Sequence, residues 1–546
     1  MMEQVTTDDQ DIGGFDRLKR GFRDAYAVLR GSPRDIEEYA PGEHEPLVSF
    51  SGLPGYEEIE RYWVDPPFVF VSINYSAKEN EHLYYVVEPD LDEWAVTILE
   101  NLVDDLRQTL IHRRDIGERN TPDVIQSELT NLLDEYGVAV DTRTFHKFLY
   151  YLDRRFRGYD QIDPIMQDPY IEDISCDGYG KPLFVYHNRY TDIKTNIEFE
   201  QKELDDFVVQ LAQQSGRSIS IAEPITNATL PDGSRCEFAL GNEVTPHGSA
   251  FTIRKYEEDP MTPITLIDYG TFSLDQMAYL WLAIQNNKSL IFAGGTASGK
   301  TTSMNAISMF IPPRAKVITI EDTQEIRLHH ENWLSAVTRS GVGGESNVDM
   351  YDLLRSSLRH RPEYIIVGEV RGKEAMTLFQ AMNTGHTTYS TMHADSLQTV
   401  INRLENNPIN VPRSMIQTLD ILSIQTVTRI DDERVRRSQE LAEVISIDQR
   451  TGDLDYVNVF SWDPSEDTFE GGQTNSHLLG EIQEEQGWSH SELLEELRNR
   501  KRVLKYAQQK DVTDYQSFTA LVNKYYSEPD AVLERVDSEL DDDEIE

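Results

Sequence analysis

The 546-residue sequence contains only two cysteines, Cys176 and Cys236, which lie far apart along the chain. It has no C-x-x-C pair, so neither a cysteine-rich zinc site nor a disulfide framework is expected. No apolar run approaches the roughly 18 residues of a membrane-spanning helix, and the N-terminus lacks the basic and apolar regions of a signal peptide. These absences predict a cytoplasmic protein that is at most held on a membrane by a partner.

Positive charge is also scarce, because 51 Lys and Arg residues face 96 Asp and Glu residues and leave a net charge of −45. Nucleic acid is therefore not expected as the main partner, since duplex binding needs clustered Lys and Arg. The carboxylates occur throughout the chain, which we interpret as adaptation to high intracellular salt. An ordinary acidic protein is the alternative, and equal or better stability at low salt than in molar KCl would favour it.

The length predicts several domains. Residues 1–120 are expected to form an acidic α+β domain, with an amphipathic helix over 15–29 and a hairpin of strands 68–75 and 83–87. A second α+β domain is predicted over 121–256, and a proline-containing linker over 257–264. Strands and helices alternate over 265–465, as in a parallel sheet covered on both faces. Residues 466–546 read as a helical extension whose acidic end, 537–546, is expected to be disordered.

Residues 294–301 form a complete G-x-x-x-x-G-K-[ST] phosphate loop, preceded by an apolar run and followed by a helix-compatible stretch. Glycines let backbone N–H groups close around phosphate oxygens, and the helix N-terminus adds partial positive charge. Lys300 is expected to reach the β- and γ-phosphates, and the Thr301 hydroxyl to hold Mg²⁺. The predicted nucleotide-binding residues of the loop are Gly294, Gly295, Thr296, Ala297, Ser298, Gly299, Lys300, Thr301 and Thr302.

Two acidic segments follow predicted strands. Glu321, Asp322 and Glu325 come at the end of the strand 317–320, at the edge where α/β sheets bind ligands. Such carboxylates can hold Mg²⁺ or its waters, although a solvated acidic turn would have the same sequence pattern. Glu369 comes just past the buried strand 364–367, where a carboxylate can orient an attacking water and contribute to the metal shell.

Two histidines bracket the strand 387–391. One of the pair, His386 or His393, could sense a γ-phosphate by hydrogen bonding, while a structural pair is the plainer interpretation. No third metal ligand is evident nearby, so a metal site is not favoured. We assign His386 to nucleotide binding and His393 to catalysis.

With these four motifs in order, the chain resembles the secretion ATPase superfamily of type II secretion, type IV pili and archaella, over about residues 143–465. The resemblance implies a RecA-like α/β ATPase domain preceded by smaller α+β N-terminal domains, with ATP and Mg²⁺ as cofactors. It also implies a homohexamer, and arginines of the N-terminal domain that reach the phosphates. Arg217, Arg235 and Arg254 fit those positions, although each could instead form a surface salt bridge.

Two residues depart from the pattern of this superfamily. Glu363 stands where the Walker B motif usually has Asp, which places the metal-water geometry there in doubt, and Gly372 stands where the Glu-x-Arg-Asp ending has Asp. The paired C-x-x-C zinc module of bacterial members is absent. Because it lacks this module and has an acidic composition, the chain resembles the archaeal branch of the superfamily, and the salt-loving members of that branch in particular.

The resulting hypothesis is a motor at the cytoplasmic face of the membrane. It would hydrolyse ATP to power pilin assembly or protein export, with a polytopic membrane platform protein as partner and the pilin or secreted substrate as indirect cargo. The archaellum motor is the alternative within the family, and retraction or conjugation motors are further options. A RecA-like nucleic-acid motor and a nucleotide-gated structural ring are the alternatives from other classes, and no basic groove or aromatic stacking platform favours the former.

Overall fold

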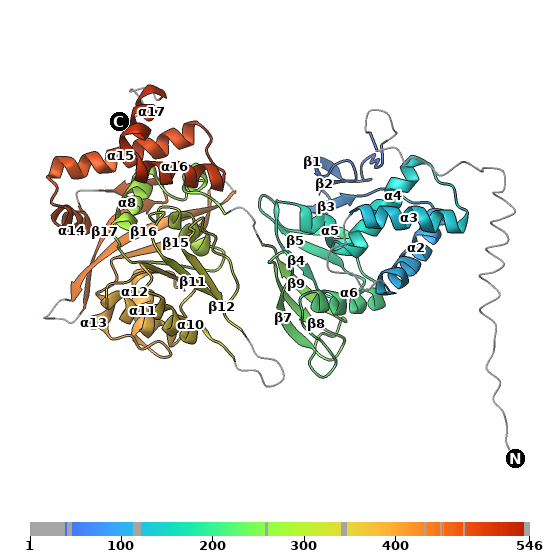
Figure 1. The fold of residues 1–546 in the computed structure, drawn as a ribbon, viewed down its shortest axis with the longest axis horizontal. Helices are drawn as coiled ribbons and strands as arrows, with labels where there is room; N and C mark the ends of the chain where they lie inside the picture. The colour runs from blue at the N-terminus through green and yellow to red at the C-terminus, as the bar shows by residue number, and fades with distance from the viewer. Residues whose placement is uncertain are drawn as a thin grey trace, which may run out of the picture. The chain divides into compact units, whose positions relative to one another are not determined.

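A computed structural model describes residues 39–40, 46–112, 122–256, 260–339, 347–430, 433–447, 450, 453–472 and 475–539. The helix predicted over 15–29 lies outside these residues. The chain divides into two compact units, Met1–Tyr256 and Glu257–Glu546, each of which has its own sheet (Figure 1).

The elements of the first unit follow in chain order. They are β1 (Glu57–Asp65), β2 (Val69–Ser76), β3 (Glu81–Val87), α2 (Glu93–His112), α3 (Pro122–Tyr136), α4 (Thr142–Phe156), η1 (Asp160–Ile162), α5 (Asp163–Gln167), β4 (Ile171–Cys176), β5 (Pro182–His187), β6 (Thr191–Glu198), α6 (Gln201–Gln214), β7 (Ile225–Thr229), β8 (Arg235–Ala239) and β9 (Ala250–Arg254).

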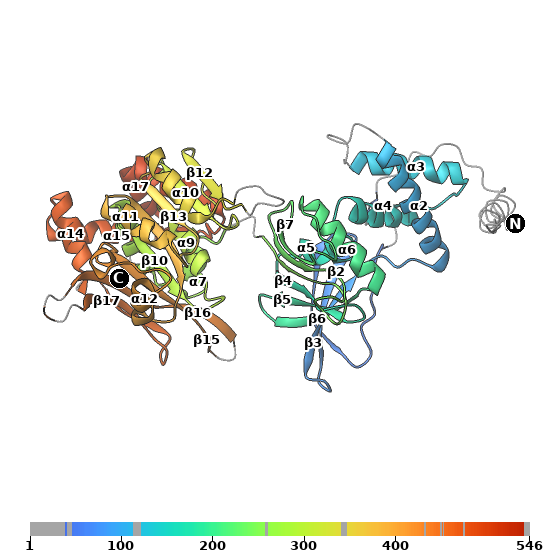
Figure 2. The same ribbon diagram turned by 90° about the horizontal axis from the view of Figure 1, so that it is seen from below.

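One nine-stranded sheet runs through the whole first unit, in the order β1-β2-β3-β6-β5-β4-β9-β8-β7. The predicted hairpin is confirmed, because β2 and β3 pair antiparallel. The pairing of β3 with β6 continues the sheet across residue 120, where the sequence predicted a domain boundary. Helices α2, α3 and α4 lie beside the sheet (Figures 1 and 2) with an apolar cluster of their own that includes Leu102, Leu129 and Phe148.

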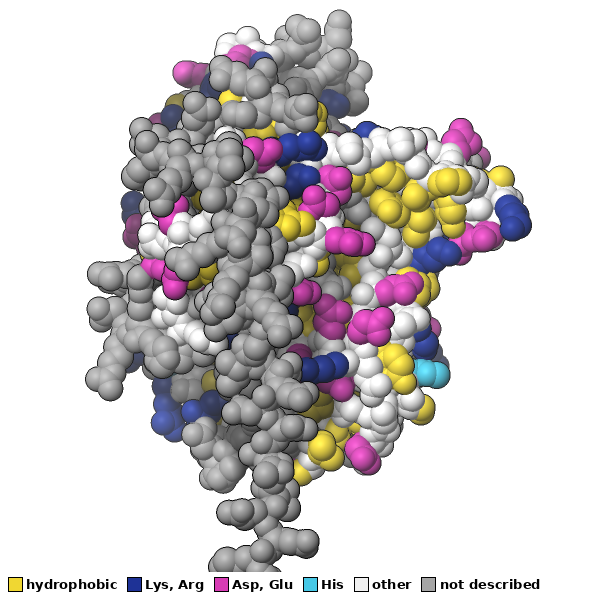
Figure 3. Space-filling view, turned by 90° about the vertical axis from the view of Figure 1, so that its right-hand side faces the viewer, with side chains coloured by type: hydrophobic (Ala, Val, Ile, Leu, Met, Phe, Trp, Pro, Cys, Tyr) yellow, Lys and Arg dark blue, Asp and Glu magenta, His cyan; other side chains and the backbone are white. Residues whose placement is uncertain are grey.

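On the face drawn in Figure 3, Asp and Glu side chains are scattered among neutral, apolar and basic ones. That face agrees with the even spread of acidity in the sequence. Of the helices that the structure describes, none combines the length and the apolar character needed to cross a bilayer.

The elements of the second unit are as follows. They are α7 (Pro263–Asp268), α8 (Leu274–Gln285), β10 (Leu290–Gly294), α9 (Lys300–Ser308), β11 (Val317–Glu321), β12 (Trp333–Val337), α10 (Met350–Ser357), η2 (Leu358–His360), β13 (Tyr364–Val367), α11 (Glu374–Asn383), β14 (Thr387–His393), α12 (Leu397–Glu405), α13 (Arg413–Ile416), β15 (Ile421–Ile430), β16 (Glu433–Ile447), β17 (Leu454–Asp463), β18 (Thr468–Gly471), α14 (His477–Gln486), α15 (His490–Gln509), α16 (Tyr515–Ser527) and α17 (Pro529–Glu539).

The predicted parallel sheet is confirmed in the order β12-β11-β13-β14-β10-β15, and β16, β17 and β18 extend it antiparallel. Alternate residues of β10 enter opposite layers of the core. Leu290 and Phe292 join the cluster that includes α8 and α15, whereas Ile291 and Ala293 join the cluster that includes α11 and α12. Burial on both faces explains why these strands read as continuous apolar runs.

The C-terminal helices pack on this same core rather than forming a separate layer. Leu497, Phe518 and Val536, from α15, α16 and α17, belong to the cluster that contains β10 and α8. Two predictions need correction here. Residues 537–539 of the acidic end, expected to be disordered, are the last turn of α17, and the rest of that end lies outside the described residues. The predicted linker ends earlier than residue 264, because Pro263 begins α7.

Candidate active site

The phosphate loop has the strand–turn–helix setting that its sequence predicted. All five residues of β10 are buried, and α9 begins at Lys300. Gly299 caps the helix with a φ of 87°, a backbone conformation that side chains other than glycine rarely adopt. A Cβ on Gly294 would lie 2.4 Å from the Gln425 carbonyl oxygen, so β15 fits closely only against a glycine.

The side chains of the loop fold back onto its own backbone. Lys300 Nζ donates a hydrogen bond to the Gly295 carbonyl oxygen at 2.6 Å, and Ser298 Oγ donates to the same oxygen at 2.9 Å. Thr296 and Ala297 at the crown are exposed, while Thr301 and Thr302 lie half-buried in the first turn of α9. A phosphate oxygen could replace the Gly295 carbonyl as the acceptor for Lys300, and the helix N-terminus would favour its negative charge.

The other motifs meet the loop at one edge of the sheet because their strands are parallel. Gly294 is paired with His393, and Ile320 with Val367, so the strands β10, β14, β11 and β13 all end there. Glu321, Asp322 and Glu369 therefore lie at the carboxyl edge that carries the phosphate loop.

Glu321 shapes the turn that follows its strand. Its side chain is buried, and Oε1 accepts hydrogen bonds from the backbone N–H groups of Glu325 at 2.8 Å and Ile326 at 3.0 Å. A Cβ on Gly368 would lie 3.3 Å from Glu321 Cγ, which explains a small residue directly before Glu369. Glu321 thus acts on the conformation of the segment that contains Glu325.

Arg371 joins two of the predicted metal ligands. It donates to Asp322 Oδ2 at 2.5 Å and lies 3.5 Å from Glu369 Oε2, and Thr338 Oγ1 donates to Asp322 Oδ1 at 3.1 Å. The side chains of Arg371, Asp322 and Glu369 are 63%, 44% and 34% exposed, so solvent screens these ion pairs. The sequence prediction gave Arg371 no role, and only the strand register shows that it bridges two motifs.

The predicted Mg²⁺ ligands do not form a protein-only cage. Within the described ranges no group of three His, Cys, Asp or Glu side chains is arranged to hold a metal. Mg²⁺ that binds together with a nucleotide takes most of its oxygens from phosphate and water and only one or two from protein. Thr301, Asp322, Glu325 and Glu369 lie at the ends of α9, β11 and β13 from which such contacts could come.

Two residues predicted near the nucleotide lie at the opposite edge. His386 precedes β14, whereas His393 ends it, and at about 3.3 Å per residue the two are roughly 23 Å apart. His386 Nδ1 lies 3.2 Å from Thr384 Oγ1. Glu363 precedes β13 in the same way, and its Oε1 accepts from the Lys316 backbone N–H at 3.2 Å. The doubt about metal geometry at Glu363 therefore has no basis in the fold.

Arg436 is a loop contact that sequence reasoning missed. It lies in β16, and its Nε donates to the Ala297 carbonyl oxygen at 3.0 Å. Its Cδ lies 3.3 Å from the position that a Cβ on Gly299 would take. Ala297 has a φ of 57°, which lies in the left-handed region. Arg436 therefore contacts the crown of the loop at a residue whose backbone conformation is uncommon for a non-glycine residue. No local motif marks Arg436, because the contact depends on the pairing of β15 with β16.

The three predicted arginine fingers lie in the first unit. Arg235 begins β8 and Arg254 ends β9, and the register pairs these two residues directly. Arg254 is also paired with Asp173 on β4. Arg217 lies just after α6, where its backbone N–H donates to the Ala212 carbonyl oxygen at 2.8 Å. The first unit thus brings Arg235 and Arg254 together and leaves Arg217 at a helix end.

The chain is also similar to known proteins over much of its length. The family model described as type II/IV secretion system protein matches residues 186–511, and a PilB3-like N-terminal model matches residues 16–90. An uncharacterised protein of Methanocaldococcus jannaschii is 39% identical over 390 residues, which cover 70% of each chain. A conjugal transfer protein, TrbB, of Rhizobium radiobacter is 35% identical over 233 residues, which cover 41% of this chain and 68% of TrbB.

A solved structure also matches, that of the VirB11 ATPase from the Brucella suis type IV secretion system in complex with sulphate. It is 25% identical and has a TM-score of 0.27, and the match covers 51% of this chain and 90% of that one.

Proposed function

The chain belongs to the type II/IV secretion system protein family, and from that premise we propose that it is a Mg²⁺-dependent ATPase that drives pilin assembly or protein export. The observation that carries this proposal is the placement of the phosphate loop and Glu369 at one edge of the parallel sheet. Binding groups and a carboxylate that can direct water then act on the same phosphate chain.

In this mechanism, different residues of the chain bind the phosphates, orient the water and contact the γ-phosphate. Lys300 leaves the Gly295 carbonyl and donates to a phosphate oxygen, while the amides of the loop and of the first turn of α9 bind the others. Glu369 orients the attacking water, and His393 lies beside Gly294 where it can donate to the γ-phosphate. Mg²⁺, when bound beside Thr301, would neutralise charge on the β- and γ-phosphates.

We place Arg217, Arg235 and Arg254 as candidates for arginine fingers supplied across subunits of a ring. The direct pairing of Arg235 with Arg254 in the sheet register supports the idea that these two act together, because paired residues of neighbouring strands present their side chains on the same face. Arg217 is the weaker candidate, since it belongs to no strand and the register pairs it with neither of the other two. A hexamer remains the expected ring size from the family resemblance.

Among the machines served by this family, pilus assembly is the role that we propose first. The match of residues 16–90 to a PilB3-like N-terminal model supports it over the archaellum motor. We propose that the chain works at the cytoplasmic face of the membrane, and that its first 120 residues dock on a polytopic platform protein. Deletion of that segment with full recovery of the platform in a pull-down would contradict the docking role.

The test is ATP hydrolysis by the full chain in molar KCl over a range of protein concentrations. A ring motor predicts specific activity that rises cooperatively with concentration and falls roughly 10³-fold in Arg235→Ala, the order of an arginine finger's effect. Activity that is independent of concentration and unaffected by Arg235→Ala would remove the trans-arginine ring. DNA-stimulated hydrolysis would favour the nucleic-acid motor instead.

A further inference from the structure

The amino edge of the parallel sheet carries a cluster of cations. Arg314 and Lys316 precede β11, and Arg359, His360 and Arg361 precede β13. Because Val317 is paired with Tyr364, these two connections lie side by side. Arg314, Arg359, His360 and Arg361 are exposed, and Lys316 is half-buried. We call these five residues the cationic edge.

The cationic edge has no carboxylate partner in the part of the chain that the structure describes. None of its side chains forms an ion pair there, although the sequence holds 96 Asp and Glu residues. Two carboxylates are close in the fold. Glu363 accepts from a backbone N–H, that of Lys316, and Glu331 lies two residues before β12. A cluster of unpaired cations in a chain of net charge −45 is a specific feature rather than an expected one.

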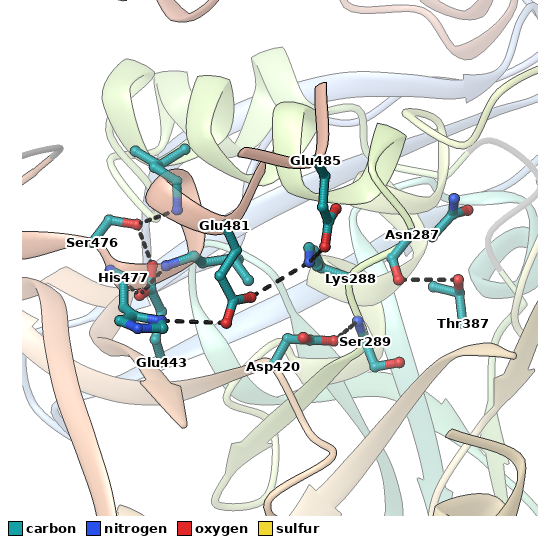
Figure 4. Close-up of polar contacts among 12 residues, drawn as sticks. Asn287, Lys288, Ser289, Thr387, Asp420, Glu443, Ser476, His477, Glu481 and Glu485 are labelled. Atoms are coloured by element: carbon teal, nitrogen blue, oxygen red, sulfur yellow. Dashed lines mark hydrogen bonds and ion pairs between the residues drawn. The ribbon is translucent and has the colours of Figure 1, made fainter. Parts of the chain in front are cut away.

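At the β10 end of the same edge, another cation is paired with carboxylates of the chain (Figure 4). Lys288, which precedes β10, is buried and lies 3.0 Å from Glu485 Oε1 and 3.6 Å from Glu481 Oε2. Those two glutamates are one turn apart on α14, and Glu481 also faces His477 Nδ1 at 3.4 Å. An acidic helix thus already covers the β10 end of this edge, while the β11 and β13 end has no such cover in the described chain.

Charge and geometry favour a protein over a membrane as the missing partner. The planar guanidinium of arginine suits bidentate pairing with a carboxylate, and three of the five residues are arginines. An anionic lipid surface would meet the whole acidic protein and be repelled by most of it. A narrow acidic segment would meet only the cations. Arg361, with a φ of 52°, ends the η2 turn and holds the tip of this connection in a defined conformation.

We propose that the cationic edge is a docking surface for an acidic segment of a partner protein, with carboxylates spaced one helical turn apart as they are on α14. The proposal goes beyond ATP hydrolysis, since its residues lie at the edge opposite the phosphate loop. It can therefore fail while the ATPase assignment stands.

The test uses the full chain and a labelled helical peptide that carries pairs of glutamates four residues apart, with a glutamine twin as reference. Binding is measured by anisotropy at the lowest KCl concentration at which a melt shows the chain folded. The charge reversal Arg359→Glu/Arg361→Glu is compared with Arg403→Glu/Arg498→Glu, which makes the same charge change at exposed arginines on α12 and α15. We expect roughly a tenfold loss of affinity in the first pair and less than a twofold change in the second.

Other outcomes would overturn the proposal. Equal binding of the glutamine twin, or equal loss in both variant pairs, would remove the specific surface. Binding to phosphatidylglycerol vesicles but not to the peptide would assign the edge to lipid. A change in oligomeric state with Arg359→Glu/Arg361→Glu would assign it to contacts between copies. Tighter peptide binding after removal of residues 540–546 would identify the chain's own acidic end as the occupant.

Discussion

The two edges of the parallel sheet in the second unit differ in chemistry although the same strands build both. The carboxyl edge carries the phosphate loop with Glu321, Asp322 and Glu369. The amino edge carries Lys288, which pairs with Glu485 of α14, and the five residues of the cationic edge, whose side chains form no ion pair among the described residues. Strand polarity, not nearness in sequence, decides which residues can meet the nucleotide, and a motif that spans a whole strand is split between the edges.

Among the residues of the phosphate loop and its contacts, the largest effect is expected from removing the loop cation at the carboxyl edge. Lys300→Ala deletes the cation that can replace its Gly295 contact with a phosphate contact. We expect ATP hydrolysis to fall at least 100-fold, because the lysine neutralises charge on the β- and γ-phosphates. A coupled-enzyme assay in molar KCl measures this, with the thermal melt as the folding control. Turnover within tenfold of the parent would contradict the role.

The next largest effect is expected at the amino edge of the sheet, as a loss of folding stability when Glu443 is replaced. Glu443 of β16 is buried and accepts from Tyr279 OH at 2.6 Å. It also accepts from the His477 and Leu478 backbone N–H groups at 2.7 and 2.9 Å, and from Ser476 Oγ (Figure 4). Glu443→Ala would leave these donors without an acceptor and release the start of α14. We expect a loss of about 3 kcal/mol.

The matched variant for that prediction is Glu470→Ala, which removes an exposed carboxylate from β18. Denaturant unfolding followed by tryptophan fluorescence should separate the two variants clearly. If both shift the midpoint equally, Glu443 does not anchor α14.

Asp420 makes the amino edge sensitive to pH. Burial raises the pKa of Asp420 to about 6, against the opposing effects of the Ser289 backbone N–H at 2.6 Å and the charge of Lys288. The folded state therefore holds this proton more tightly than the unfolded state. The resulting stability is present below about pH 4 and is lost as the pH rises through 6.

Asp420→Asn removes the dependence of folding stability on the protonation of residue 420, and it keeps an acceptor for the Ser289 backbone N–H. We expect the variant to be more stable than the parent at pH 7 by an amount on the order of 2 kcal/mol, and its stability to vary less between pH 4 and 6. Chemical unfolding at a series of pH values measures both. A parent whose stability rises across this window more steeply than the variant's would contradict the sign.

A smaller effect is expected at the loop contact from β16. Arg436→Ala frees the Ala297 carbonyl, so the loop loses part of its pre-formed shape. We expect about a tenfold weaker affinity for ADP, measured by calorimetry, with little change in the melt. Arg429→Ala, an exposed arginine on β15, serves as the control for charge. Equal affinities in both variants would show that Arg436 does not position the loop.

Local sequence signals predicted much of this fold. The phosphate loop, the apolar runs 317–320 and 364–367 and the hairpin of β2 and β3 were correctly placed, because turn chemistry and burial act on neighbouring residues. The boundary expected at residue 120 failed to divide the sheet because β3 pairs with β6, which lies more than 100 residues later. His386 and Arg436 illustrate the same limit for the site, since their positions depend on strand direction and on strand pairing.

The most direct test of the account compares the two glutamates that flank β13. ATP hydrolysis is measured for the parent, Glu369→Gln and Glu363→Gln in molar KCl with Mg²⁺, alongside ADP affinity. We expect a roughly 100- to 1000-fold loss of turnover in Glu369→Gln with ADP binding retained, and turnover within twofold of the parent in Glu363→Gln. A comparable loss in Glu363→Gln, or full activity in Glu369→Gln, would contradict the assignment of catalysis to the carboxyl edge.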